Sequence, residues 1–235
     1  MSEIDDFEQI RIESDGEMLV GWMKTNIKAQ ESPLIIFFGG NAQCSSNTCA
    51  AFLDNDIYSY FEGYNFLMVD YPGYGLSDGT PSDKSMFDAA LAVYDFAIEL
   101  ECVDKNRVVA LGYSIGTGVA TYLASQRDVD GLILLAPYDC ALSLYNDTLY
   151  IFHGPLELLA RYEFDSKEYA KSVSTRPLII ATKDDEIINY EFSVNLSTYF
   201  QLQPEVVLLD GFGHNDMFAQ KEVLDEIRGY IEERI

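Results

Sequence analysis

A serine lies at the centre of the sequence Gly-Tyr-Ser-Ile-Gly, residues 112–116, between an apolar run and a helix-like segment at 117–126. At such a strand–turn–helix junction the serine has a strained backbone that projects its hydroxyl out of the sheet. The flanking glycines let strand and helix approach closely. We therefore predict Ser114 as a nucleophile. The N–H of Ile115, at the helix N-terminus, is predicted to stabilise negative charge on the substrate.

A serine hydroxyl needs a general base, and the chain contains only two histidines. His214 directly follows the last apolar run and has Gly211 and Gly213 before it. This loop can bring the imidazole to the carboxyl edge of a sheet, where ligands bind in open α/β folds. His153 lies in a long segment with no strand before it and is interpreted as a surface or packing residue. His214 is therefore the predicted base.

The base in turn needs a carboxylate that orients it and stabilises its charged form. Asp184 and Asp185 follow the apolar run at 178–181, and Asp139 follows the run at 132–136. The chain order serine, aspartate, histidine holds for each of them. These residues alone leave the three candidates open.

A second donor to the oxyanion is expected in the turn after residues 34–38, which has the sequence Gly-Gly-Asn-Ala-Gln at 39–43. Its glycines allow a backbone N–H to approach the reacting carbonyl. We predict the main-chain N–H of Asn41, with Ala42 as the next candidate. A phosphate-binding loop is excluded because the lysine and hydroxyl residues of such a loop are missing.

Short apolar runs that alternate with helical patterns must position these residues. The runs lie at 9–12, 18–24, 34–38, 66–69, 108–111, 132–136, 178–181 and 206–209. The first two form a predicted hairpin that turns at 14–16. The others are apolar without alternation, which is typical of parallel strands buried on both faces. We therefore predict an α/β fold with a mostly parallel sheet and helices on both faces.

Two helices are predicted from apolar stripes at helical spacing. The first has Phe87, Leu91, Tyr94 and Ile98, with Ser82 or Asp83 as its N-cap; the second, near the C-terminus, has Val223, Ile227, Tyr230 and Ile231. Residues 137–176 contain no clear strand and indicate two or three short helices. We expect a single domain over residues 1–235, with a small helical cap insertion at about 138–176.

Composition excludes several classes of protein. The net charge is −24 and no run of Lys and Arg occurs, which argues against nucleic-acid binding and against an anionic membrane surface. With 13% aromatic residues the chain is not a disordered acidic tail. No apolar run could span a bilayer, and no signal peptide is recognised. The four cysteines fit no zinc pattern. We expect a cytoplasmic protein without a metal or cofactor.

The motifs together resemble the α/β-hydrolase-fold serine hydrolases. They lie at residues 38–42, 70–79, 112–118, 136–139 and 213–216. The resemblance is to the small-cap branch that includes acyl-protein depalmitoylase-like enzymes, and also to serine aminopeptidase-like and prolyl-peptidase-like hydrolases. In this family the triad aspartate precedes an acidic and two apolar residues, which favours Asp185. The chain departs from the pattern at Asn189, where proline is usual, and at Gly39, where histidine is common.

The resemblance implies a serine hydrolase that cleaves carboxylic esters or acyl thioesters of modest size through an acyl-enzyme, without a cofactor. A peptidase acting on short peptides is the alternative, and a non-catalytic binding protein is a third. A small molecule is the expected partner, and the sequence gives no sign of oligomeric state. Possible pocket-lining residues are Tyr71, Tyr74, Tyr113 and Tyr138. Asp70 is expected to hold the amides of its own loop.

Overall fold

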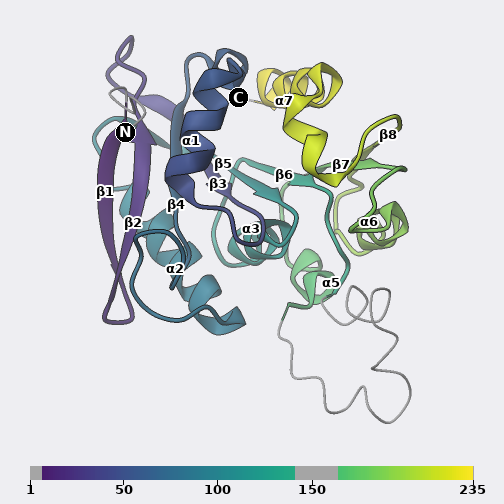
Figure 1. Cartoon of the computed structure of the whole chain (residues 1–235), viewed down its shortest axis with the longest axis horizontal. Coiled ribbons are helices and arrows are strands. Elements are labelled where there is room, and N and C mark those ends of the chain that lie inside the picture. Colours follow the sequence, from purple (N-terminus) through teal and green to yellow (C-terminus); the bar gives the residue numbers. More distant parts are fainter. Residues whose placement is uncertain (1–6, 141–163, 235) are drawn as a thin grey trace.

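The computed structural model describes residues 7–140 and 164–234. An eight-stranded sheet with the order β1-β2-β4-β3-β5-β6-β7-β8 forms its centre (Figure 1). The strands are β1 (Glu8–Ser14), β2 (Glu17–Lys24), β3 (Ser32–Phe38), β4 (Asn65–Val69), β5 (Val103–Tyr113), β6 (Gly131–Leu135), β7 (Leu178–Thr182) and β8 (Glu205–Leu209). Only β2 runs antiparallel to its neighbours, and β3 to β8 pair in parallel. The predicted α/β-hydrolase fold class is confirmed.

Burial along the strands explains their sequences. Every residue of β3, β6 and β7 is buried, because helices cover both faces of the central sheet. At the edge, buried and exposed residues alternate along most of β1. The β1–β2 hairpin turns through Asp15 and Gly16, which both have positive φ. Strand β5 begins at Val103, earlier than its apolar run predicts. Its first half is polar and pairs with β3 only at Val103.

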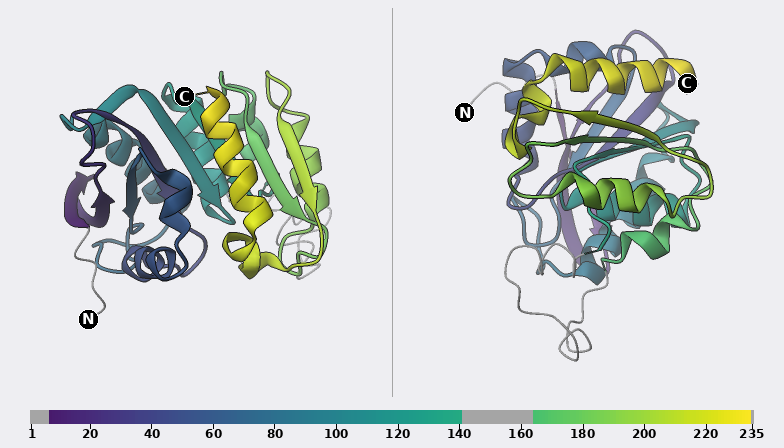
Figure 2. Two further views of the ribbon diagram at one scale, coloured as in Figure 1. Left: turned by 90° about the horizontal axis from the view of Figure 1, so that it is seen from above. Right: turned by 90° about the vertical axis from the view of Figure 1, so that its right-hand side faces the viewer.

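Helices form a layer on each side of the sheet (Figure 2). One face carries α1 (Ser45–Asp54), the 3-10 helices η1 (Ile57–Phe61) and η3 (His214–Ala219), and α7 (Lys221–Arg234). The other face carries α2 (Asp83–Ala97), α3 (Gly116–Gln126), α5 (Ser166–Ala170) and α6 (Tyr190–Ser197). The four predicted apolar residues of α7 are all buried. Ser82, rather than Asp83, is the N-cap of α2, and its side chain accepts a hydrogen bond from the Ser85 N–H.

The predicted cap insertion at 138–176 falls only partly within the described residues. Its described part includes α5, which packs against α3 and α6. His153 and the segment 141–163 lie outside the described residues, so the cap and the role of His153 stay predictions. No helix in the described ranges combines the length and the apolar character needed to cross a membrane.

The parallel strands bring the candidate residues to one edge of the sheet. Strands β3, β5, β7 and β8 end next to the turn at 39–43, Ser114, the acidic run 184–186 and the loop before His214, respectively. Because parallel strands place their carboxyl ends at the same edge, segments up to about 175 residues apart in the chain meet there.

Candidate active site

Ser114 occupies a sharp turn between β5 and α3. Its φ of +55° lies in the left-handed region, which is strained for a serine. Gly116 makes this turn possible: a Cβ there would lie 2.1 Å from the carbonyl oxygen of Phe38. A Cβ on Gly112 would lie 2.6 Å from the Gly116 carbonyl oxygen. Strand, turn and helix are therefore packed so closely that only glycine fits on either side of the serine.

The His214 imidazole bridges Ser114 and Asp185. Its Nε2 lies 3.0 Å from the Ser114 Oγ, and its Nδ1 lies 2.7 Å from the Asp185 Oδ2. The side chains of His214 and Asp185 are only 4% and 1% exposed. A carboxylate at Nδ1 favours the tautomer that carries its proton on that nitrogen. Nε2 is then free to accept the hydroxyl proton of Ser114.

Asp185 is itself held in place by the main chain that follows it. Its Oδ1 accepts hydrogen bonds from the N–H groups of Ile187 and Ile188, at 2.8 and 2.7 Å. One carboxylate oxygen thus binds the backbone while the other faces the imidazole. This arrangement fixes the direction of the oxygen that contacts His214.

The two other candidate carboxylates bind elsewhere. Asp184 Oδ2 accepts a hydrogen bond from the Gly211 N–H at 2.6 Å. Asp139 Oδ2 accepts from the side-chain amide of Asn195 at 2.6 Å and lies 3.5 Å from the Lys167 Nζ. Among the three aspartates that the sequence leaves open, the structure therefore brings only Asp185 to the imidazole.

Three side chains at and after the end of β7 bind the main chain of the loop that carries His214. Thr182 donates to the Phe212 carbonyl at 2.7 Å, Asp184 accepts from the Gly211 N–H, and Glu186 accepts from the His214 N–H at 3.0 Å. A Cβ on Gly213 would lie 2.5 Å from the Glu186 Oε2, so glycine allows this approach. The sequence reasoning missed Glu186, although a run of three consecutive acids was visible at 184–186.

The turn after β3 packs against the serine. A Cβ on Gly40 would lie 3.3 Å from the Ser114 Cβ, and the Gly40 N–H donates to the Gln43 Oε1 at 2.5 Å. Ala42, with φ of +57°, completes the turn. The main-chain N–H groups of Asn41 and Ile115 donate to no atom of the described residues. Both predicted donors thus have an uncommitted N–H, and both lie in segments that flank the serine.

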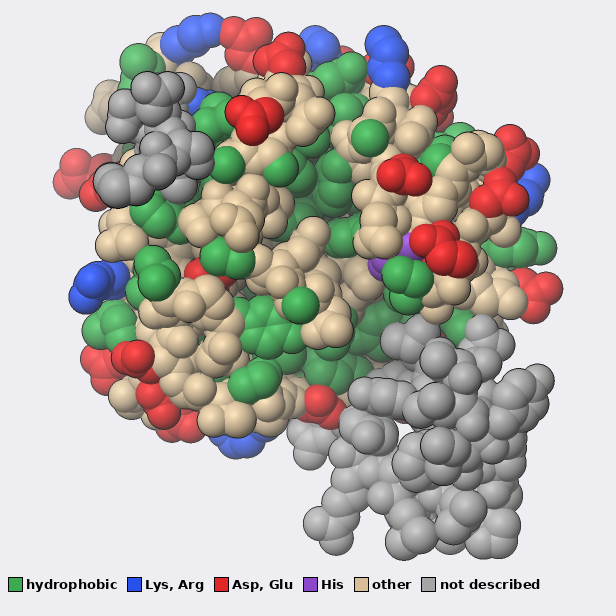
Figure 3. All heavy atoms as spheres, in the orientation of Figure 1, with side chains coloured by type: hydrophobic (Ala, Val, Ile, Leu, Met, Phe, Trp, Pro, Cys, Tyr) green, Lys and Arg blue, Asp and Glu red, His purple; other side chains and the backbone are tan. Residues whose placement is uncertain are grey.

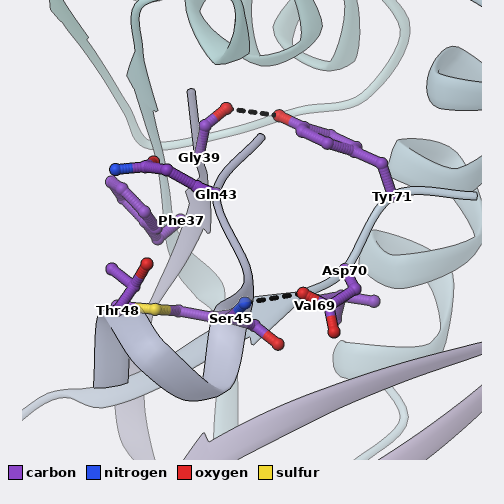
Figure 4. Close-up of a pocket in the computed structure, with 9 residues that line it drawn as sticks. Phe37, Gly39, Gln43, Ser45, Thr48, Val69, Asp70 and Tyr71 are labelled. Carbon is purple, nitrogen blue, oxygen red and sulfur yellow. Dashed lines mark hydrogen bonds between the residues drawn. The ribbon is translucent and has the colours of Figure 1, made fainter. Parts of the chain in front are cut away.

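Asp70 and Tyr71 hold the segment that contains this turn (Figure 4). Asp70 is 3% exposed, and its two oxygens accept from the N–H groups of Ser45 and Leu76, at 2.6 and 3.2 Å. The expectation that Asp70 binds loop amides is confirmed. The Tyr71 hydroxyl donates to the Gly39 carbonyl at 3.0 Å. These contacts fix both ends of the segment between β3 and α1.

The remaining tyrosines also bind loops of the site. The Tyr113 hydroxyl donates to the His214 carbonyl at 2.9 Å, and the two ring centroids lie 5.2 Å apart. Burial, aided by the nearby Asp185 and Glu186 carboxylates, raises the pKa of Tyr113 to about 12. The hydroxyl therefore stays protonated and able to donate.

The Tyr74 hydroxyl lies 2.9 Å from the Asn41 Oδ1, and the Tyr138 hydroxyl 3.4 Å from the Ile115 carbonyl oxygen. Burial raises the pKa of Tyr138 well above its ordinary value. The four predicted tyrosines thus contact the segments around Ser114 and His214. Whether they also line a substrate pocket stays a prediction.

Figure 3 shows an acidic side chain directly beside the histidine, while hydrophobic and uncharged atoms make up most of the surface around it. Across residues 7–140 and 164–234, no three His, Cys, Asp or Glu side chains are grouped as a metal site would require. The arrangement at Ser114 brings together a hydroxyl, an imidazole and a carboxylate, beside two uncommitted main-chain N–H groups, and these are the kinds of group that acyl transfer can use.

Comparisons with known proteins identify the family and the fold of the chain. A family model described as alpha/beta hydrolase fold matches residues 33–176, more than half of the chain. The alpha/beta hydrolase domain-containing protein aho-3 of Caenorhabditis elegans is 29% identical over 168 residues, which are 72% of this chain and 49% of that protein. The chain thus spans about half the length of this relative.

Two solved structures share the fold. An acetyl xylan esterase from Paenibacillus sp. R4 has a TM-score of 0.78 at 16% identity, covering 100% of this chain and 87% of that one. Est1E from Butyrivibrio proteoclasticus, solved with ferulic acid bound, has a TM-score of 0.75 at 20% identity, and the match covers 95% of this chain and 96% of that one.

Proposed function

The chain belongs to the alpha/beta hydrolase fold family, and from that premise we propose that it is a serine hydrolase cleaving carboxylic esters or acyl thioesters. Ser114 is the proposed nucleophile, His214 the base and Asp185 the orienting acid. The continuous contact from Ser114 Oγ through His214 to Asp185 Oδ2, at 3.0 and 2.7 Å, carries this proposal. The N–H groups of Ile115 and Asn41 are the proposed oxyanion donors.

In the proposed acylation step, His214 Nε2 takes the hydroxyl proton as the Ser114 Oγ bonds to the acyl carbon. The carbonyl π electrons move to the oxygen, which becomes an oxyanion held by the Ile115 and Asn41 N–H groups. When this intermediate collapses, the bond to the leaving oxygen or sulfur breaks, and His214 gives its proton to that atom. The acyl group stays on Ser114 as an ester.

Deacylation repeats these steps with water. His214 takes a proton from the water as the water oxygen attacks the acyl carbon, and the same two N–H groups hold the second oxyanion. Collapse returns the proton from His214 to Ser114 and releases the carboxylic acid. Asp185 keeps the imidazole oriented and stabilises its charged form throughout.

The structural neighbours support an ester or thioester substrate, because the two named above are described as an acetyl xylan esterase and as Est1E with ferulic acid bound. The same triad also serves amide cleavage. Peptide substrates therefore belong in the test as the alternative.

The proposal is tested with a panel of acyl esters, acyl thioesters and short peptides, assayed with the wild-type protein and with Ser114→Ala. We expect ester and thioester turnover by the wild type and a loss of at least about 10³-fold in kcat for the variant. Unchanged circular dichroism shows that the variant is folded. Turnover by Ser114→Ala at the wild-type rate would overturn the assignment, and turnover of peptides alone would replace the esterase by a peptidase.

A further inference from the structure

A groove of about 440 Å³ lies between α1 and η3, next to the site of the proposed reaction. Its lining includes Ala42 and Gln43, which follow Asn41, and Asn215, which follows His214. Its volume is within the range of roughly 300–1,000 Å³ that is usual for small-molecule sites. The lining of the α1–η3 groove therefore includes chain neighbours of both the proposed oxyanion donor and the base.

The lining of the α1–η3 groove contains no charged side chain, although 23% of the chain is charged and the net charge is −24. Aromatic rings line its inner part: Phe218 has ring centroids 4.9 Å from Phe52 and 5.6 Å from Tyr113. Phe52 and Tyr113 are only 4% and 6% exposed. The inner wall is thus a fixed aromatic surface, which favours an apolar or flat group.

Side-chain amides line the rim. The amides of Asn47 and Asn215 bind no atom of the described residues, and both residues are exposed. Gln43 differs, because its Oε1 already accepts the Gly40 N–H. Uncommitted amides can donate to and accept from an uncharged polar group. They cannot neutralise a charge, so a charged group in the groove would lose hydration without gaining an ionic partner.

We propose that the α1–η3 groove binds the leaving group of the substrate and selects an uncharged one. This inference rests on the proposed function. Because His214 must protonate the leaving atom, the leaving group has to pass the His214 loop, and the oxyanion lies on the side of Asn41. The α1–η3 groove is lined by a residue adjacent to each of these groups, Asn215 next to His214 and Ala42 next to Asn41. The preferred substrates are esters or thioesters of a neutral alcohol or thiol with an apolar face and hydrogen-bonding atoms.

The test compares two series of nitrophenyl esters at about 0.5 M salt, where long-range fields are screened. In the first series the nitrophenol leaving group is neutral, carries a carboxylate or carries a trimethylammonium group. In the second the leaving group is neutral and the same charges are on the acyl chain. For the wild type we expect kcat/KM at least tenfold higher for the neutral leaving group than for either charged one.

Asn47→Asp adds a charge to the rim without changing its shape, and Gln30→Glu is the matched control on the exposed turn between β2 and β3, at the opposite end of the sheet. We expect Asn47→Asp to raise the cation-over-anion ratio of the leaving-group series three- to tenfold, and Gln30→Glu to leave it unchanged. Equal ratios in the two variants, or a shift confined to the acyl series, would overturn the inference.

Ala51→Phe adds a size test, since Ala51 is an exposed lining residue of the groove. It should lower the kcat/KM ratio of the nitrophenyl to the methyl ester at least fivefold, and an unchanged ratio would contradict the proposal. Failure of the inference and failure of the proposed function are distinguishable. If Ser114→Ala loses turnover but Asn47→Asp leaves the cation-over-anion ratio unchanged, only the role proposed for the groove is refuted. Turnover by Ser114→Ala refutes the proposed function itself.

Discussion

At the scale of single residues, three consecutive acids have three different tasks. Asp184 holds the Gly211 N–H, Asp185 faces the His214 ring, and Glu186 holds the His214 N–H. Only Asp185 has its side chain almost fully buried, at 1% exposure. A carboxylate excluded from water interacts more strongly with a charged imidazole, which suits the role proposed for Asp185.

Asp185→Asn should therefore lower kcat, whereas Asp139→Asn should lower stability. We expect Asp185→Asn to lower kcat by roughly 10³- to 10⁴-fold, because an amide favours the wrong imidazole tautomer. Asp139→Asn should keep kcat near the wild-type value and lower the free energy of unfolding by about 1–3 kcal/mol, since Asp139 is buried beside Lys167 and Asn195. Ester kinetics and urea unfolding measure the two effects. The opposite pattern would make Asp139 the catalytic acid.

Glu186 should act as a positioning residue for His214. Glu186→Ala removes the acceptor of the His214 N–H, and we expect kcat to fall about three- to tenfold with little change in KM. Glu186→Gln retains an acceptor oxygen and should restore most of kcat. Glu191→Ala, at an exposed position in α6, is the control. Equal losses in the alanine and glutamine variants would show that charge, rather than loop position, is what matters.

Residue types and their order were enough to predict Ser114 and His214, which the structure places 3.0 Å apart. They left three aspartates open, because order along a chain does not say which carboxylate faces the ring. Glu186 and Gln43 were missed for a related reason. Each binds a main-chain N–H, and which N–H a side chain reaches depends on the path of the loops, which residue type alone does not give.

At the scale of elements, the site depends on how closely β3, β5 and α3 approach one another. A Cβ on Gly116 would lie 2.1 Å from the Phe38 carbonyl oxygen and 2.6 Å from that of Gly39. Both are backbone atoms, so no side-chain rotation relieves the clash. In contrast, a Cβ on Gly229, at an exposed position of α7, would meet nothing within 4 Å.

Alanine at the two positions should therefore have opposite effects on stability. We expect Gly116→Ala to lower the free energy of unfolding by about 3 kcal/mol or more and to abolish turnover, through strain at the serine turn. Gly229→Ala should raise it by about 1 kcal/mol, because alanine is the better helix former. Chemical unfolding of both variants measures the difference. A neutral Gly116→Ala would mean that β3 and α3 are not held as closely as described.

The elements differ in how well the sequence predicts them. Continuous apolar runs marked the six strands β3 to β8, a hairpin pattern marked β1 and β2, and α2 and α7 had clear apolar stripes. Helix α1 has no clear apolar stripe, since only Ser45, Cys49 and Phe52 are buried in it. The polar first half of β5 was also missed, because it pairs with its neighbour only at its first residue. Apolar spacing reports burial, so it predicts poorly where an element is mostly exposed.

At the scale of the whole molecule, the net charge of −24 sets the long-range field. The ion pairs of the described residues are mostly exposed pairs of one acid with one base, such as Arg127 with Asp95 at 2.7 Å, and such pairs contribute little to stability. Unpaired acids are in large excess. This field should attract cations and repel anions before they reach the site.

Ionic strength should therefore change which esters the protein uses. With 10 mM salt, where screening extends to about 30 Å, we expect kcat/KM for a cationic ester to exceed that for its anionic analogue severalfold more than it does in 0.5 M salt. The charge is best placed at the far end of the acyl chain, away from the α1–η3 groove. A ratio independent of salt would show that the acidic surface does not steer substrates.

The central claim, that Ser114 is the nucleophile of a Ser114–His214–Asp185 triad, is tested most directly by covalent labelling with a fluorophosphonate followed by mass spectrometry of the digested protein. We expect one adduct per chain on the peptide that contains Ser114, complete loss of esterase activity in step with labelling, and no adduct in Ser114→Ala. An active protein that stays unlabelled at Ser114, or that is inactivated through an adduct at another residue, would contradict it.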